Sequence, residues 1–189
     1  MTAALSDMPP GGGWTTDDLD GLPEDGVRRE LLDGVLLVSP SPSSAHQIIA
    51  MRLGVALEQT CPSEYPVTQA VEVRISPRRS FIPDVLVVTD GAAQRAPHRF
   101  APHEVMLAVE IVSPTSVSMD RITKPALYAQ AGIPFYWCIE TDETITVRAY
   151  KIDPGNNIYA PAGTFTDRIE TSEPWPIDIP ISSLTPRYL

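Results

Sequence analysis

The chain has 189 residues, 43% of them hydrophobic and 20% charged, which suits one globular domain with a sizeable core and is too short for two ordinary domains. Lys and Arg number 14 against 24 Asp and Glu, and the formal net charge of -10 argues against a protein that holds nucleic acid by bulk electrostatic attraction. The 20 prolines are scattered between apolar runs, which excludes a chain that is disordered throughout.

Cysteine usage and the N-terminal sequence indicate the cellular setting. Cys61 and Cys138 are too few for a disulfide framework and lack the spacing of a zinc site, so two buried reduced thiols are expected. The N-terminus has neither a basic nor an apolar signal region, and no stretch approaches the roughly 20 consecutive apolar residues of a membrane span. The sequence therefore predicts a cytoplasmic protein that does not enter a membrane.

The first part of the chain predicts an arm, a short helix and a hairpin. Residues 1–13, which end in three glycines, are expected to form a flexible arm before a single domain over residues 14–189. Residues 15–18 are typical of the start of a short helix. Within residues 29–38, Asp33-Gly34 separates two apolar runs, which strongly favours a β-hairpin.

Helical and extended patterns then alternate along the chain. Apolar residues recur at helical spacing over residues 48–58, and an extended pattern follows over residues 65–75. Residues 82–88 and 105–112 are nearly all apolar, which predicts two strands covered on both faces and adjacent in a central sheet. The segment between them, residues 90–103, is expected to be a loop.

The last third of the chain predicts one more helix and further strands. A helix is expected over residues 116–132, with Pro125 near its start and Gly132 at its end. Residues 135–139 and 144–150 are typical of strands, and the proline-rich remainder is expected to form edge strands and turns.

Two carboxylates occupy positions that soluble proteins rarely give to acids: Asp84 begins one apolar strand, and Glu110 lies inside the next. If the strands are adjacent, both acids can point at one spot. Two carboxylates, a backbone carbonyl and waters suit a hard cation such as Mg²⁺, and such a site can activate water against a phosphodiester. The alternative is structural: Asp84 caps a turn, and Glu110 pairs with a nearby arginine.

A series of motifs follows in order between Arg28 and Trp137. The motifs are Arg29-Glu30-Leu31-Leu32-Asp33-Gly34, Ser39-Pro40-Ser41-Pro42 with His46, Pro83-Asp84-Val85-Leu86-Val87-Val88, Val109-Glu110-Ile111-Val112-Ser113-Pro114-Thr115-Ser116, Asp120 to Lys124, Tyr128, Ala131-Gly132-Ile133-Pro134 and Tyr136-Trp137. This set resembles the Uma2 (DUF820) family of the PD-(D/E)XK nuclease superfamily. The resemblance implies a mixed α/β (α+β) fold with a restriction-endonuclease-like core. Its central mixed β-sheet is flanked by helices, with an N-terminal β-hairpin and extra C-terminal strands.

The resemblance also implies roles for site residues. Asp84, Glu110 and the backbone carbonyl of Ile111 are expected to bind Mg²⁺, with Mn²⁺ as a substitute. The superfamily pattern has a lysine two residues after the second acid, where this chain has Val112. Lys124, at the start of the following helix, is the candidate to orient the attacking water and offset phosphate charge. The alternative for Lys124 is a solvated helix residue.

Three further residues have two interpretations each. Glu30 adds a third acid to the site, or it pairs with Arg28 or Arg29. His46 contacts a phosphate or transfers a proton, or it is a helix-cap or surface histidine. Asp120 is expected to cap the following helix rather than to bind metal.

The resemblance thus implies a Mg²⁺-dependent DNA endonuclease that hydrolyses phosphodiester bonds, with a homodimer as a further expectation. The alternative is a catalytically weak nuclease-fold binding or interaction module, which Val112 and the acidic composition favour. A third interpretation, a hydrolase with Ser113 or Cys138 as nucleophile, lacks a positioned base and a GxSxG motif.

The negative charge is concentrated in the flanks of the chain. Residues 28–124 carry ten acids and ten bases, whereas residues 1–27 carry six acids and no base. A metal bound to two acids of the central stretch would leave its arginines available for phosphates. The arginines expected to be free are Arg74, Arg78, Arg79, Arg95 and Arg99.

Overall fold

The computed structural model describes residues 12–23, 25–142 and 144–188. The predicted N-terminal arm lies outside the described residues except for Gly12 and Gly13. Helix α1 (Thr16–Asp20) is capped by the Thr15 hydroxyl, which accepts a hydrogen bond from the Asp18 amide. The predicted hairpin is confirmed as β1 (Arg28–Leu32) and β2 (Val35–Ser39). Asp33 and Gly34 form its turn with φ values of 51° and 82°, the positive values that two-residue hairpin turns require.

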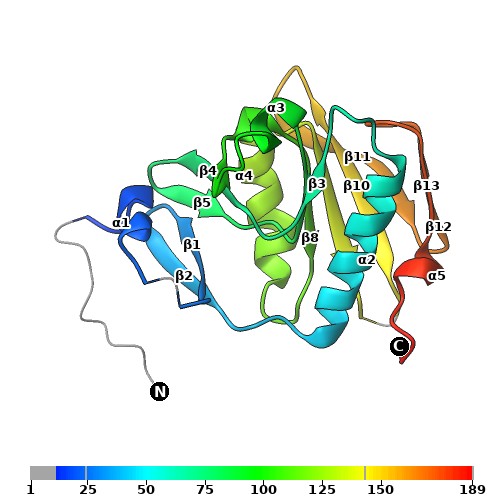
Figure 1. The fold of residues 1–189 in the computed structure, drawn as a ribbon, viewed down its shortest axis with the longest axis horizontal. Helices are drawn as coiled ribbons and strands as arrows, with labels where there is room; N and C mark the ends of the chain where they lie inside the picture. The colour runs from blue at the N-terminus through cyan, green and yellow to red at the C-terminus, as the bar shows by residue number, and fades with distance from the viewer. Residues whose placement is uncertain (1–11, 24, 143, 189) are drawn as a thin grey trace.

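The strands of the described residues form three sheets (Figure 1). The first sheet has the order β2-β1-β5-β4-β7 and adds β4 (Glu72–Ser76), β5 (Arg79–Phe81) and β7 (Arg99–Phe100) to the hairpin. The central sheet has the order β11-β10-β9-β8-β6-β3, with β3 (Val67–Thr68), β6 (Val85–Val88), β8 (Val105–Ile111), β9 (Phe135–Glu140), β10 (Thr146–Asp153) and β11 (Ile158–Phe165). The third sheet pairs β12 (Arg168–Thr171) with β13 (Ile177–Pro180).

The central sheet is mixed and is covered on both faces. Strand β8 pairs antiparallel with β6 and parallel with β9, which confirms that the two apolar strands are neighbours. Helix α2 (Ser44–Thr60), the β12–β13 sheet and α5 (Ile181–Leu184) pack on one face. Helix α4 (Lys124–Gln130) and the first sheet pack on the other (Figure 1). Alternate residues of β6 enter the two cores, so all four of its residues are buried, as the apolar run predicted.

The predicted helix over residues 116–132 begins differently from the expectation. A π-helical turn, η3 (Met119–Thr123), precedes α4, and Pro125 lies in the first turn of α4. Because Pro125 has no amide hydrogen and its ring would clash with a carbonyl four residues earlier, the wider π turn accommodates it. Gly132 ends the helix with φ of 85°, and the amide of Ile133 donates to the Tyr128 carbonyl in a Schellman motif.

Two other expectations about secondary structure are wrong. Residues 65–75 contain two strands in different sheets, because Ala70 takes a φ of 53° between β3 and β4 and turns the chain. The period-two pattern continues across this turn, so the sequence conceals it. The expected loop over residues 90–103 contains helix α3 (Asp90–Ala93), β7 and the start of a 3-10 turn, η2 (Pro102–Glu104).

The cysteines and the helices bear on two further expectations. Cys61 and Cys138 are free thiols, as expected, but only Cys138 is fully buried. Among the described residues, no helix is both long enough and apolar enough to cross a membrane.

Candidate active site

Asp84 and Glu110 come together where β6 begins and β8 ends. Strands β6 and β8 pair with Val85 opposite Val109, and each acid is the next residue beyond this pair. The Asp84 amide donates to the Val109 carbonyl at 3.0 Å, which keeps the two chains together at this point. The guanidinium of Arg28 lies 2.8 Å from Asp84 and 3.9 Å from Glu110, so both carboxylates face one basic side chain.

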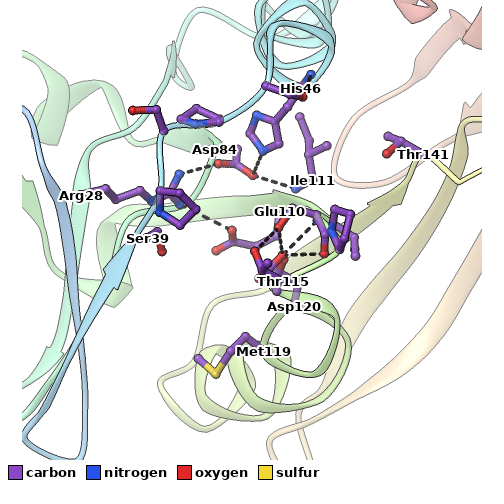
Figure 2. Close-up of a pocket in the computed structure, with 18 of the residues that line it drawn as sticks. Arg28, Ser39, His46, Asp84, Glu110, Ile111, Thr115, Met119, Asp120 and Thr141 are labelled. Carbon is purple, nitrogen blue, oxygen red and sulfur yellow. Dashed lines mark hydrogen bonds and ion pairs between the residues drawn. The ribbon is translucent and has the colours of Figure 1, made fainter. Parts of the chain in front are cut away.

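Three groups hold the Asp84 carboxylate (Figure 2). Its Oδ1 accepts a hydrogen bond from Nη1 of Arg28 at 2.8 Å. Its Oδ2 accepts from the backbone amide of Ile111 at 2.8 Å and lies 3.1 Å from Nε2 of His46. Burial alone would raise the pKa of Asp84. The hydrogen bond with His46 and the charge of Arg28 outweigh burial and hold this pKa at about 2.

Glu110 is bound to helix α4 rather than to solvent. Its Oε1 accepts a hydrogen bond from the hydroxyl of Tyr128 at 2.8 Å and lies 3.0 Å from Nζ of Lys124. Only 1% of Glu110 is exposed. Burial therefore raises the pKa of Glu110 to about 8, against the opposing effect of the Lys124 charge.

Lys124 forms ion pairs with three carboxylates that come from different elements. Its Nζ lies 3.0 Å from Glu110, 3.1 Å from Glu30 Oε1 and 3.5 Å from Asp120 Oδ1. Burial by itself would lower the pKa of Lys124, but these three negative charges raise it, so the amine stays protonated. Lys124 is 3% exposed, which excludes the alternative of a solvated helix residue.

Glu30 enters the site from the first sheet. Its Oε1 accepts a hydrogen bond from the amide of Ile82 at 2.8 Å. Of its two candidate arginine partners, Arg28 places Nη2 3.7 Å from Glu30, whereas Arg29 pairs with Asp25 at 2.7 Å. The alternation of side chains along β1 explains this, because Arg28 and Glu30 share a face and Arg29 points to the other.

The expectation that Asp120 caps the helix is wrong. Asp120 lies inside the π turn, buried to 2% exposure, and Ser118 precedes that turn. Its carboxylate faces Lys124, and its backbone carbonyl accepts a hydrogen bond from the Tyr136 hydroxyl at 2.6 Å. Burial raises the pKa of Asp120. The helical pattern could not locate this side chain, because the π turn changes the direction of every residue within it.

These side chains line a single pocket of about 450 Å³. Two loops rich in hydroxyl groups, residues 39–43 and 113–116, contribute further parts of its wall. His46 projects into this pocket from the first turn of α2, whose cap is the Ser43 side chain and not His46. The structure therefore brings together all the residues that the sequence singled out: Glu30, His46, Asp84, Glu110, Ile111 and Lys124.

Arg28 and Tyr128 are site residues to which the sequence assigned no role of their own. The sequence suggested Arg28 only as a partner of Glu30, although its closest acid is Asp84. Its position two residues before Glu30 on a strand was the available signal, because such residues share a face. The helical spacing placed Tyr128 only in the apolar face of the helix, and no sequence feature indicates that its hydroxyl reaches Glu110.

The donor chemistry of the pocket fits a divalent cation. Among the described residues, no three His, Cys, Asp or Glu side chains form a ready metal-binding group. Mg²⁺ does not require one, because it commonly binds through one or two carboxylates and retains several waters. Four buried acidic side chains face two basic side chains here, so the acids outnumber the bases by two. The carboxylates are Glu30, Asp84, Glu110 and Asp120, and the basic side chains are Arg28 and Lys124.

The expectation of free arginines is wrong. Within the described residues Arg74 and Arg99 both pair with Asp20, Arg79 pairs with Asp33, Arg95 pairs with Glu104, and Arg78 donates to the backbone carbonyls of Gly12 and Asp33. Counting charges along the chain placed these arginines in a neutral stretch. The fold brings Asp20 of the acidic N-terminal segment against Arg74 and Arg99, because α1 packs beside the first sheet (Figure 1), and it pairs Arg79 and Arg95 with acids of the neutral stretch itself.

The chain resembles known proteins both in sequence and in fold. The Uma2 family model, described as "Putative restriction endonuclease", matches residues 16–181. The crystal structure of a "putative nuclease belonging to DUF820" from Anabaena variabilis superposes with a TM-score of 0.69 at 20% sequence identity. That match covers 90% of this chain and 96% of the other, and it shows that the fold is shared. No functionally curated protein matches the chain.

Proposed function

The chain belongs to the Uma2 family of restriction-endonuclease-like proteins, and from this premise we propose that it is a Mg²⁺-dependent DNA endonuclease that hydrolyses phosphodiester bonds. One observation carries the proposal. Asp84, buried directly before β6, and Glu110, buried in the adjacent strand β8, open into one pocket in which Lys124 lies 3.0 Å from the second acid.

In this proposal Asp84, Glu110 and the backbone carbonyl of Ile111 hold the Mg²⁺ ion, for which Mn²⁺ can substitute. Bound there, the ion supplies Lewis-acid stabilisation of the phosphate and lowers the pKa of water. The surplus of buried acids over bases in the pocket supports this assignment, since a bound divalent cation favours the ionised form of the acids that hold it.

Lys124 takes the role of the lysine that the superfamily carries two residues after the second acid. Val112 occupies that position and packs in the apolar core beneath α4, so a basic side chain there would lose this packing. The Lys124 amine donates to Glu110, orients the attacking water and offsets charge on the phosphate.

Glu30 and His46 support these groups. Glu30 shares the Lys124 amine with Glu110 and so fixes where the amine lies. His46 hydrogen-bonds Asp84 through Nε2 while its Nδ1 is buried without a hydrogen bond among the described residues. A histidine in this position can hold Asp84 in place or move a proton at the edge of the site.

Plasmid cleavage tests the proposed activity. Purified full chain should nick or linearise supercoiled DNA with Mg²⁺ or Mn²⁺ and lose this activity in EDTA. Asp84→Asn and Glu110→Gln should each reduce cleavage by at least about 100-fold, since both remove charge at the metal. Asp178→Asn, an exposed acid of β13, is the matched control and should cleave normally.

The alternative function, a nuclease-fold binding module without efficient catalysis, is favoured by the ion pairs that occupy Asp84 and Glu110 in this structure. Calorimetry with Mn²⁺ separates the two. If the protein binds metal but cleaves no duplex DNA, single-stranded DNA or RNA, the binding module is the function that remains. Cleavage that survives Asp84→Asn would disprove the proposed site. The expected homodimer is a separate prediction that sedimentation analysis tests.

A further inference from the structure

Arg28 reaches the pocket from outside the central sheet and helix α4. It lies on β1 of the first sheet, and Nη1 donates to Asp84 Oδ1 at 2.8 Å. Figure 2 shows it reaching toward Asp84 from the side opposite His46. The proposed metal site also uses the Asp84 carboxylate, so the Arg28 guanidinium and the metal ion compete for the same group.

Arg28 contacts the carboxylates of the pocket less closely than Lys124 does. Its Nη2 donates to the backbone carbonyl of Ile82 and lies 3.9 Å from Glu110 and 3.7 Å from Glu30, both beyond hydrogen-bond length. Its Nε is buried without a hydrogen bond among the described residues. The side chain is 23% exposed, against 4% for Lys124, so Arg28 is the more solvent-accessible of the two basic side chains.

We propose that Arg28 is a built-in counter-ion that a divalent cation displaces from Asp84, after which its guanidinium binds the scissile phosphate. This inference rests on the proposed function and adds a phosphate-binding residue to it. In the metal-free protein Arg28 neutralises Asp84, which would otherwise be a buried, uncompensated charge. When the cation neutralises Asp84 instead, the guanidinium of Arg28 is free at the pocket. Its planar pair of N–H donors then fits two oxygens of a phosphate.

This exchange couples the binding of the metal ion to the binding of the substrate phosphate. A cation that displaces Arg28 makes its guanidinium available to phosphate, and a phosphate that binds the guanidinium frees Asp84 for the cation. Coupling of binding free energies is reciprocal, so each ligand must strengthen the binding of the other by the same factor. Arg28 thereby limits metal binding in the absence of DNA.

Mn²⁺ titration of the full chain by calorimetry tests the inference without relying on activity. Arg28→Met removes the competitor and should bind Mn²⁺ about tenfold more tightly than the wild type. Arg29→Met is the matched control, because it removes the same charge from the adjacent residue, which pairs with Asp25 outside the pocket. Its Mn²⁺ affinity should stay within about twofold of the wild-type value.

Two further measurements keep the test decisive if Arg28→Met folds poorly. Arg28→Lys keeps the charge but loses the planar fork, and it should bind Mn²⁺ about threefold more tightly. A short phosphorothioate oligonucleotide should raise the Mn²⁺ affinity of the wild type about tenfold. It should raise the Mn²⁺ affinity of Arg28→Lys by a smaller factor.

Equal or weaker Mn²⁺ binding by both Arg28 variants would overturn the inference while leaving the proposed nuclease intact. A wild-type Mn²⁺ affinity that is unchanged by the oligonucleotide would also overturn the inference and leave the proposed nuclease intact. A wild-type protein that binds no Mn²⁺ would instead overturn the inference together with the metal-dependent function. The two failures are therefore distinguishable.

Discussion

Nζ of Lys124 lies 3.0 Å from Oε1 of Glu110, although the lysine begins helix α4 and the acid lies within strand β8. The residue two positions after Glu110 is Val112, which is buried in the apolar core. A basic group therefore reaches the second acid from the helix that covers the sheet, and not from the strand that carries the acid.

Lys124→Met should lower the free energy of unfolding of the metal-free protein by about 3 kcal/mol, because three buried carboxylates lose their shared cation. Urea denaturation measures the change. Lys151 is the other lysine of the chain, and it pairs with Glu173 at the surface. Lys151→Met should change the stability by less than about 0.5 kcal/mol, and an equal loss in both variants would contradict the burial argument.

Glu110→Gln should make the metal-free protein more stable at pH 9 than the wild type, with the difference vanishing near pH 5. The pKa of Glu110 is about 8 in the folded protein and 4.5 as its ordinary value, so the folded state binds the extra proton. The contribution of the protonated carboxyl to stability is complete below pH 4.5 and is lost as the pH rises through 8.

Denaturation of both proteins across pH 5 to 9 measures this difference, and each pH unit between the two pKa values is worth about 1.4 kcal/mol. Glu170→Gln, at an exposed position of β12, is the control and should show no such trend. A variant less stable than the wild type at pH 9 would mean that Lys124 stabilises the ionised Glu110 by more than burial costs, and that the pKa of Glu110 is not raised.

Pro125→Ala should convert the π turn before α4 into regular α-helix, because residue 125 regains an amide that can donate to the carbonyl of Arg121. That change turns the Lys124 side chain about the helix axis and away from Glu110. Cleavage should fall by at least about tenfold, while the free energy of unfolding stays within about 1 kcal/mol.

A crystal structure of Pro125→Ala checks the geometry, and Pro154→Ala in an exposed turn is the control for loss of a proline. If the π turn persists in the variant, something other than Pro125 maintains it, and Pro125 does not determine the position of Lys124.

Asp20→Asn should increase metal-independent DNA binding. The substitution frees Arg99 from its ion pair and removes one of the two acidic partners of Arg74. The affinity should become more salt-dependent, with the slope of log affinity against log salt steeper by about 1 for each additional phosphate that an arginine neutralises. Fluorescence anisotropy at several salt concentrations measures the slope. Asp17→Asn removes the same charge from helix α1, and a matching increase there would indicate a net-charge effect instead.

The sequence by itself determined the strands that carry the two acids. Residues 82–88 and 105–112 are apolar enough to require burial on both faces, and an acid within such a strand is informative because burying a charge is costly. The hairpin was equally readable, since Asp33-Gly34 suits a turn that needs positive φ at both positions. Both features follow from neighbours along the chain.

Only the tertiary structure decided how the charges pair. The direction of Lys124 and Asp120 depends on a π turn, which the apolar spacing of the helix does not reveal. The pairing of Arg28 with Asp84 joins residues 56 positions apart, and α1 brings Asp20 to arginines that looked free. Ion pairs form wherever the fold brings charges within a few ångströms, and sequence order carries little information about such distances.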